Sequence, residues 1–123
     1  MTKQRVLLIE DDPTMLSLLK ILLEMENFIV DVFEGKELGD LIQQVTASPA
    51  DIILMDVYMH YFNGLDALAA IRASVVHQPG IIMTSGMDLE DKCLATGANA
   101  FIMKPYMPDT LVKIIKEQAA PEA

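Results

Sequence analysis

Apolar residues gather in four short runs along the chain, and every position within each run is apolar. The runs cover residues 6–9, 52–55, 81–83 and 101–103. Strands exposed on one face alternate apolar and polar residues, whereas uninterrupted runs are typical of strands covered on both faces in a parallel sheet. A fifth segment, residues 28–33, is interrupted by Asp31 and suits an edge strand. The pattern therefore predicts a five-stranded parallel sheet.

Segments with helical periodicity lie between these runs. Asp12 is the predicted N-cap of the first helix, with Pro13 at its first position, and this helix is expected to end near Asn27. Four further helices are predicted over residues 38–47, from 63 onward, over 88–97, and from 108 onward. Because strands and helices alternate, we expect one doubly wound α/β domain over residues 4–119 and a C-terminal tail at 120–123.

The composition agrees with a folded domain and limits its partners. Of 123 residues, 52% are hydrophobic, which excludes intrinsic disorder. A formal net charge of −9 argues against direct binding to nucleic acid. The N-terminus has too few apolar residues for a signal peptide or a membrane span, so we expect a cytoplasmic protein. Cys93 is the only cysteine, which excludes an internal disulfide, and we expect it to be a half-buried helix residue.

Polar side chains follow the apolar runs, where parallel sheets bind their ligands. They are Glu10 and Asp11 after the first run, then Asp56, Thr84 and Lys104 after the other three. Carboxylates brought together repel one another unless a cation or a protonation shift relieves them, and Mg²⁺ is the natural candidate. An amine and a hydroxyl around the same point complete a phosphoryl site whose nucleophile is a carboxylate.

Several of these residues have alternative interpretations. Asp56 taken alone could cap the next loop, and Lys104 could be an ordinary surface lysine. Ser85 competes with Thr84 for the hydroxyl role, although adjacent strand residues point to opposite sides. Asp12 is assigned to the helix cap. The remaining candidates are expected to be structural, with His60 and His77 in loops and Met15, Met55, Met83 and Met103 in the core.

Four sequence blocks resemble those of the response-regulator receiver domain of two-component signalling, in that family's order and near its spacing. The blocks are LLIEDDPTM, DIILMDVYMHYFNGLDAL, PGIIMTSG and GANAFIMKPY. Together they cover almost the whole chain. The resemblance implies a flavodoxin-like, CheY-like topology and a phosphoacceptor signalling domain that catalyses its own phosphorylation and dephosphorylation, not a conventional enzyme.

The resemblance assigns phosphoryl chemistry to three residues. Asp56 would be the phosphoacceptor, Thr84 would bind a phosphoryl oxygen through its hydroxyl, and Lys104 would contact the phosphoryl group. The peptide bond between Lys104 and Pro105 would be cis, as that pair usually is in this family. The implied donor is a phosphohistidine on a sensor histidine kinase or a phosphotransfer protein.

The resemblance also implies a metal site and a switch. Glu10, Asp11 and Asp56 would hold Mg²⁺ together with the backbone carbonyl of Tyr58. Phe101 would be the switch aromatic, turning inward when the hydroxyl of the site moves toward the phosphoryl group. The switched surface, formed by the fourth helix, fifth strand and fifth helix, would contact a downstream protein or a fused output domain, or would pair two copies as a homodimer.

The chain departs from the family pattern at three positions. His60 stands where the family commonly has proline, in the loop after Asp56. Tyr58 is bulkier than many of its counterparts, and Gly86 offers no side chain that could orient a water molecule. We therefore hypothesise a slow loss of the phosphoryl group.

Three other functions compete with this interpretation. A phosphatase of the haloacid-dehalogenase type needs a second aspartate two residues after the nucleophile, where this chain has Tyr58. A flavodoxin-like cofactor binder needs a phosphate loop after the first strand, where Glu10 and its neighbours would repel phosphate. A degenerate receiver that acts without phosphorylation would lack suitable residues at the positions named above, whereas this chain has suitable residues at all of them.

Overall fold

Five strands and five helices alternate along the chain in the computed structural model, which describes residues 3–119. The strands are β1 (Arg5–Ile9), β2 (Ile29–Val32), β3 (Ile52–Asp56), β4 (Gly80–Ser85) and β5 (Ala100–Met103). The helices are α1 (Pro13–Met25), α2 (Leu38–Ala47), α3 (Gly64–Ser74), α4 (Glu90–Thr96) and α5 (Pro108–Ala119). The alternation predicted from the sequence is confirmed, while the predicted tail at 120–123 lies outside the described residues.

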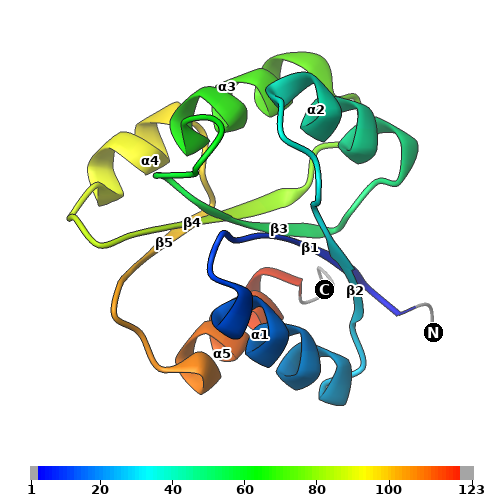
Figure 1. The fold of residues 1–123 in the computed structure, drawn as a ribbon, viewed down its shortest axis with the longest axis vertical. Coiled ribbons are helices and arrows are strands. Elements are labelled where there is room, and N and C mark those ends of the chain that lie inside the picture. Colours follow the sequence, from blue (N-terminus) through cyan, green and yellow to red (C-terminus); the bar gives the residue numbers. More distant parts are fainter. Residues whose placement is uncertain (1–2, 120–123) are drawn as a thin grey trace.

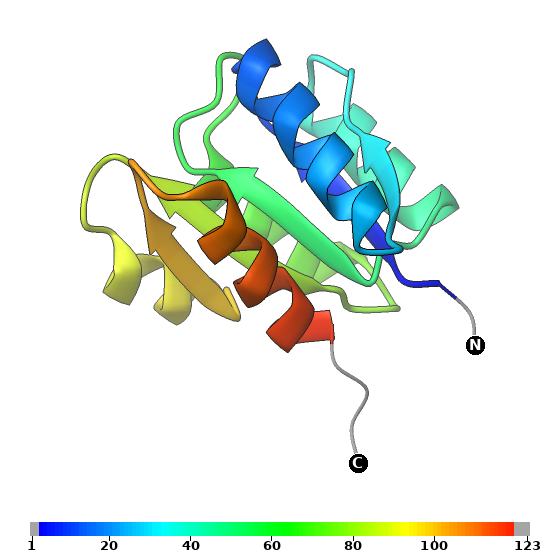
Figure 2. The same ribbon diagram turned by 90° about the horizontal axis from the view of Figure 1, so that it is seen from below.

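All neighbouring strands are parallel, and their order across the sheet is β2-β1-β3-β4-β5. The strand order reverses between β1 and β3, which places the switch point of the sheet there. Helices α2, α3 and α4 cover one face, and α1 and α5 cover the other (Figure 1). Figure 2 looks onto the face that α1 and α5 cover. The predicted doubly wound fold is confirmed.

Each strand contributes to two apolar layers, because successive side chains point to opposite faces of the sheet. In β1, Leu7 and Ile9 pack under α2 and α3, whereas Val6 and Leu8 pack under α1 and α5. The central strands β3 and β4 alternate in the same way, and their apolar residues are at most 1% exposed. Burial on both faces is the physical reason why these strands are uninterrupted apolar runs.

The helices begin and end within two residues of the positions predicted from the sequence, and polar or glycine residues cap several of these ends. The Asp12 carboxylate caps α1 by accepting hydrogen bonds from the backbone N–H groups of Thr14 at 2.9 Å and Met15 at 3.3 Å. Helix α1 ends at Met25, and α4 is a short helix closed by Gly97, whose φ of 120° favours glycine.

Two expectations about packing are wrong. Cys93 is fully buried on the inner side of α4, and burial raises the pKa of its thiol. Met103 is 49% exposed, because it is the last residue of an edge strand. Among residues 3–119, no helix is both long enough and apolar enough to cross a membrane.

Candidate functional site

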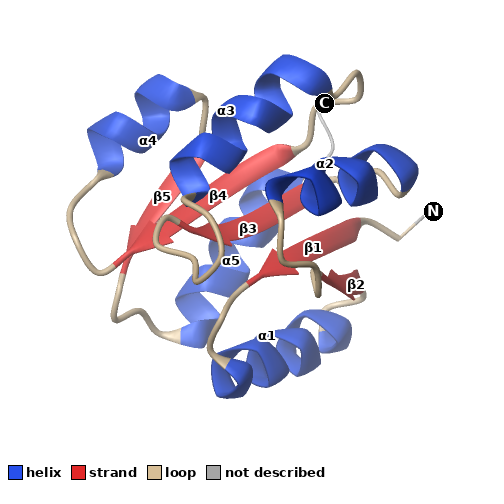
Figure 3. Ribbon diagram, turned by 45° about the horizontal axis from the view of Figure 1, so that its top comes forward, coloured by secondary structure: helices blue, strands red, loops and turns tan. Residues whose placement is uncertain are grey.

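The site lies at the carboxyl edge of the sheet, where the loops after β1, β3, β4 and β5 come together (Figure 3). Asp56 is the last residue of the central strand β3, and its register partner on β4 is Thr84. Glu10 follows β1, and Lys104 follows β5. Four residues far apart in sequence are therefore held on adjacent strands of a rigid sheet.

Lys104 connects two acidic side chains. Its Nζ lies 2.5 Å from Asp56 Oδ2 and 3.6 Å from Glu10 Oε1. The side chain of Glu10 is only 3% exposed and that of Asp56 is 13% exposed, so both carboxylates lie in a partly desolvated corner. Such a corner strengthens the attraction between these charges and raises the cost of leaving one of them unpaired.

The pKa values reflect this environment. Burial raises the pKa of Glu10 above its ordinary value, although the hydrogen bond from the Asp12 backbone and the charge of Lys104 oppose the shift. Burial by itself would lower the pKa of Lys104, but the hydrogen bond to Asp56 and the negative charges of Glu10 and Asp56 outweigh it and raise that pKa. Lys104 is thus held as a cation between the two acids.

The two adjacent hydroxyls on β4 have different environments. The Oγ of Ser85 accepts a hydrogen bond from the backbone N–H of Met87 at 3.1 Å. The Oγ1 of Thr84 is buried and has no hydrogen-bond partner among the described residues. A buried hydroxyl without a partner is uncommon and calls for an explanation. Its place beside Asp56 makes Thr84 the hydroxyl available to a ligand there.

Asp11 does not join the Lys104 cluster. Its Oδ2 accepts a hydrogen bond from the backbone N–H of His60 at 2.5 Å, in the loop that links β3 to α3. Within residues 3–119, no three acidic, histidine or cysteine side chains are grouped around one point that could hold a metal ion. The three predicted carboxylate ligands lie on the same edge of the sheet, but each of them contacts a donor of the protein itself.

The donor set nevertheless fits a hard divalent cation. Carboxylate and carbonyl oxygens are the ligands that Mg²⁺ prefers. Glu10 Oε2 is buried without a hydrogen-bond partner among the described residues, so one carboxylate oxygen is free to coordinate. Glu10, Asp11 and Asp56, with the carbonyl of Tyr58, have the right chemistry for Mg²⁺.

Tyr58 lies beside the carboxylate of Asp56. Its backbone N–H donates to Asp56 Oδ1 at 3.3 Å, and the residue is 56% exposed. The phenol oxygen lies 3.8 Å from the sulfur of Met87, in the loop after β4. A Cβ at Gly86 would have no heavy atom within 4 Å, so that position is open. Tyr58 and Met87 connect the two loops that flank Asp56.

Phe101 lies on the edge strand β5. It is half-buried, its register partner is Met83, and it packs against the core layer under α2, α3 and α4. The bond between Lys104 and Pro105 is cis, as predicted. Phe101 thus belongs to the same edge strand that positions Lys104.

Tyr106 also lies at this edge, although no pattern in the sequence singles it out. Its hydroxyl is buried without a partner among the described residues, and burial with the negative charges of Glu10, Asp56 and Asp12 raises its pKa to about 12. Tyr106 and Lys104 line a 390 Å³ hollow beside the site.

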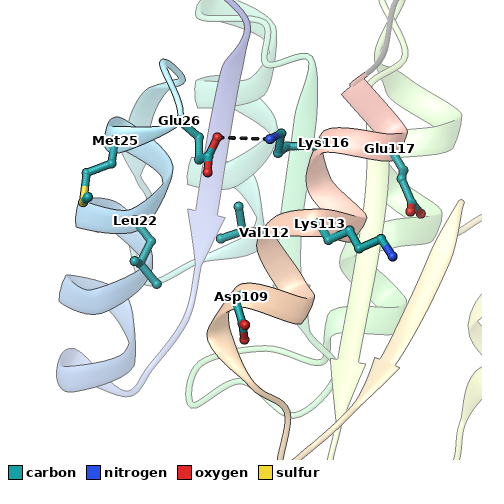
Figure 4. A pocket seen from close by; sticks show the side chains of 8 residues that line it. All are labelled: Leu22, Met25, Glu26, Asp109, Val112, Lys113, Lys116 and Glu117. Atoms are coloured by element: carbon teal, nitrogen blue, oxygen red, sulfur yellow. Dashed lines mark hydrogen bonds and ion pairs between the residues drawn. The ribbon is translucent and has the colours of Figure 1, made fainter.

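A separate surface hollow lies away from this edge, between α1 and α5 (Figure 4). Its volume is 540 Å³, and Leu22, Met25 and Val112 form its apolar part. An ion pair between Glu26 and Lys116, with 3.1 Å between nitrogen and oxygen, spans it. It contains none of the residues predicted for the site.

Comparison with known proteins identifies the family. A family model described as the response regulator receiver domain matches residues 6–116. The chain is 36% identical over 116 residues to the transcriptional regulatory protein CpxR of Escherichia coli K12, and 32% identical over 119 residues to the DNA-binding response regulator MtrA of Mycolicibacterium smegmatis. These matches cover 91% and 93% of this chain but 47% and 50% of the relatives, so the chain spans about half their length.

Solved structures agree on the fold. The signal receiver domain of a putative LuxO repressor protein from Vibrio parahaemolyticus matches with a TM-score of 0.84 at 24% identity, covering 96% of this chain and 91% of that one. A response regulator receiver domain from Bermanella marisrubri matches with the same TM-score at 25% identity, covering 97% of this chain and 100% of that one. The topology is therefore CheY-like, and the chain belongs to the response-regulator receiver domain family of two-component systems.

Proposed function

We propose that residues 4–119 form a receiver domain in which Asp56 accepts a phosphoryl group from a phosphohistidine on a histidine kinase or phosphotransfer protein. The observation that carries the proposal is the arrangement around Asp56. Lys104 contacts its carboxylate at 2.5 Å, and the buried Thr84 hydroxyl beside it lacks a partner among the described residues. An acidic nucleophile with an adjacent fixed cation and hydroxyl suits phosphoryl capture.

Each residue has a defined part in this reaction. An oxygen of Asp56 forms a bond to phosphorus while the bond between phosphorus and the imidazole nitrogen of the donor breaks. Lys104 neutralises charge on the phosphoryl oxygens, and Thr84 donates its hydroxyl to one of them. Glu10, Asp11, Asp56 and the Tyr58 carbonyl would hold Mg²⁺, which supplies further charge neutralisation when bound.

The signal would leave the site through Thr84 and Phe101. The phosphoryl group would draw Thr84 toward it. This movement of Thr84 would leave space beside β5, and the half-buried Phe101 ring would turn into that space. The α4-β5-α5 surface would then change its affinity for a downstream protein, a fused output domain or a second copy of the chain. Because CpxR is named a transcriptional regulatory protein and MtrA a DNA-binding response regulator, a fused DNA-binding output is one form that this proposal takes. We place the reaction in the cytoplasm.

Incubation with acetyl phosphate and Mg²⁺ tests the proposal by intact mass. We expect one added phosphoryl group on the native chain and none on Asp56→Asn, because the amide is not a nucleophile for phosphorus. Asp91→Asn, an exposed acid in the first turn of α4, is the matched control and should be modified like the native chain. A native chain that gains no mass, or an Asp56→Asn variant that does, would contradict the proposal.

The lifetime of the phosphoryl group gives a second test. We expect Tyr58→Asn combined with Gly86→Glu to accelerate its loss roughly tenfold, equivalent to about 1.4 kcal/mol in the barrier. The aromatic ring beside Asp56 would be replaced, and polar groups at both positions could orient water. The measurement is decay of the phosphorylated mass after the donor is removed. Tyr61→Asn, equally exposed at 55%, should leave the decay unchanged.

A further inference from the structure

The loop between β3 and α3, residues 57–63, is closed at its base by main-chain hydrogen bonds. The N–H of Gly64 donates to the carbonyl of Val57 at 2.6 Å, and Tyr58 forms an isolated antiparallel bridge with Asn63. The N–H of Val57 donates to the carbonyl of Thr84 at 2.9 Å, which fixes the start of the loop to β4. These main-chain hydrogen bonds hold the base of the loop in place.

The tip is held by Asp11. The hydrogen bond from the His60 N–H to Asp11 Oδ2 joins two loops that are 49 residues apart in sequence. The imidazole ring takes no part in this contact, since it packs edge-on against Tyr61 with 4.9 Å between the ring centroids. Both residues are exposed, so the hydrogen bond to a charged acceptor, and not burial, is what joins Asp11 to the tip.

The acidic side chains of this edge are thus each matched with a donor of the protein. Lys104 forms ion pairs with Asp56 and Glu10, and the His60 N–H donates to Asp11. No three of the described acidic side chains are gathered for a metal ion in this arrangement. Because these side chains are not gathered, sharing one cation requires a movement, and a turn of the Asp11 carboxylate away from the tip of the loop would supply it.

We propose that Asp11 is a two-position latch, which holds the loop tip through the His60 N–H in the metal-free protein and releases it when Asp11 binds a divalent cation. The proposal rests on the metal site of the proposed function. His60 acts through its main-chain N–H as a positioning residue, and a proline at position 60 could not donate this bond. Coupling between two states is reciprocal, so removing the latch donor must strengthen cation binding.

Calorimetric titration with Mg²⁺ measures the coupling directly. We compare the native chain with His60→Pro and with a semisynthetic chain in which an ester oxygen replaces the His60 N–H, so that the side chain is kept. Both should bind Mg²⁺ roughly three- to tenfold more tightly, the range expected for one lost competing hydrogen bond. His60→Ala keeps the N–H and is the matched control, with unchanged affinity.

A readout on the metal-free protein tests the latch itself. The His60 amide proton should resonate at high frequency in the NMR spectrum, and Asp11→Asn should move it to lower frequency. Adding Mg²⁺ to the native chain should move the same resonance the same way and speed the exchange of that amide with solvent, while the amides of β3 exchange no faster.

The outcomes separate this proposal from the proposed function. If the native chain binds Mg²⁺ but the ester chain binds it equally or more weakly, the latch is overturned and the metal site stands. If the native chain does not bind Mg²⁺ at millimolar concentration, the metal site and the latch are both overturned. If the ester chain binds Mg²⁺ more tightly than the native chain while His60→Pro binds it more weakly, the latch is supported and proline distorts the loop.

Discussion

Replacing Gly64 by alanine is expected to destabilise the domain by about 3 kcal/mol, near the upper end for an overpacked site. Gly64 is buried at the start of α3, and its N–H donates to the Val57 carbonyl at 2.6 Å. A Cβ added there would collide with the main-chain oxygen of Asp56 and would lie 2.9 Å from the Cα of Val57. These are backbone atoms, which cannot move aside as a side chain can.

Urea unfolding of Gly64→Ala measures the effect, and Gly39→Ala is the matched control. Gly39 is exposed within α2, and a Cβ there would meet no atom within 4 Å. The control should therefore stabilise the domain by about 0.5 kcal/mol, because alanine favours a helix more than glycine does. Equal stability of the two variants would show that the chain between Asp56 and α3 adapts easily. We also expect Gly64→Ala to accept phosphoryl groups more slowly, since the backbone of Asp56 must shift.

The sequence predicts the fold well because the sheet is covered on both faces. Because of that arrangement, β1, β3, β4 and β5 each contain an uninterrupted apolar run, and these runs alternate with helical segments along the chain. The edge strand β2 is interrupted by Asp31, and this carboxylate pairs with Arg5 of β1 at 2.8 Å. The interruption is thus explained by a cross-strand ion pair at the rim of the sheet.

The proximity of Asp56, Thr84 and Lys104 follows from the same rule, since each ends a neighbouring strand or follows one. The orientation of Asp11 could not be predicted in this way. It depends on a main-chain N–H of His60, and because every residue except proline carries such a donor, the residue type does not indicate the contact. The roles of these residues in phosphoryl transfer stay predictions.

The burial of Cys93 and the exposure of Met103 could not be predicted for a different reason. Helix α4 spans only seven residues, so its periodicity is too brief to show which side faces the sheet. Met103 ends a run that is apolar throughout, but β5 is an edge strand with a neighbour on one side only. The local pattern of residues 101–103, unlike that of residues 28–33, carries no polar interruption that would mark an edge strand.

Replacing Lys104 by methionine is expected to lower the free energy of unfolding of the metal-free domain by about 2 kcal/mol at neutral pH. Removing one partner of a buried charge cluster costs about 3–5 kcal/mol, and the 31% exposure of Lys104 reduces that figure. The rate of phosphorylation by acetyl phosphate should fall about 100-fold, as when a fixed donor to a developing anion is lost. Lys116→Met removes an exposed ion pair with Glu26 and should change stability by less than about 1 kcal/mol, without slowing phosphorylation.

The pH dependence of this loss identifies the group responsible. Burial raises the pKa of Glu10 in the folded chain above its ordinary value of 4.5, and loss of the Lys104 charge raises it further. A carboxyl group whose pKa is raised in the folded state makes folding less favourable as the pH rises from its unfolded pKa to its folded pKa. Below pH 4.5 the group is protonated in both the folded and the unfolded chain, so it does not destabilise the fold there. The deficit of Lys104→Met should therefore be largest near pH 7 and shrink toward pH 4. The measurement is urea unfolding across this pH range. Adding Glu10→Gln to Lys104→Met should remove most of the pH dependence of the deficit. A deficit that stays constant with pH would instead assign the effect to lost packing of the lysine stem.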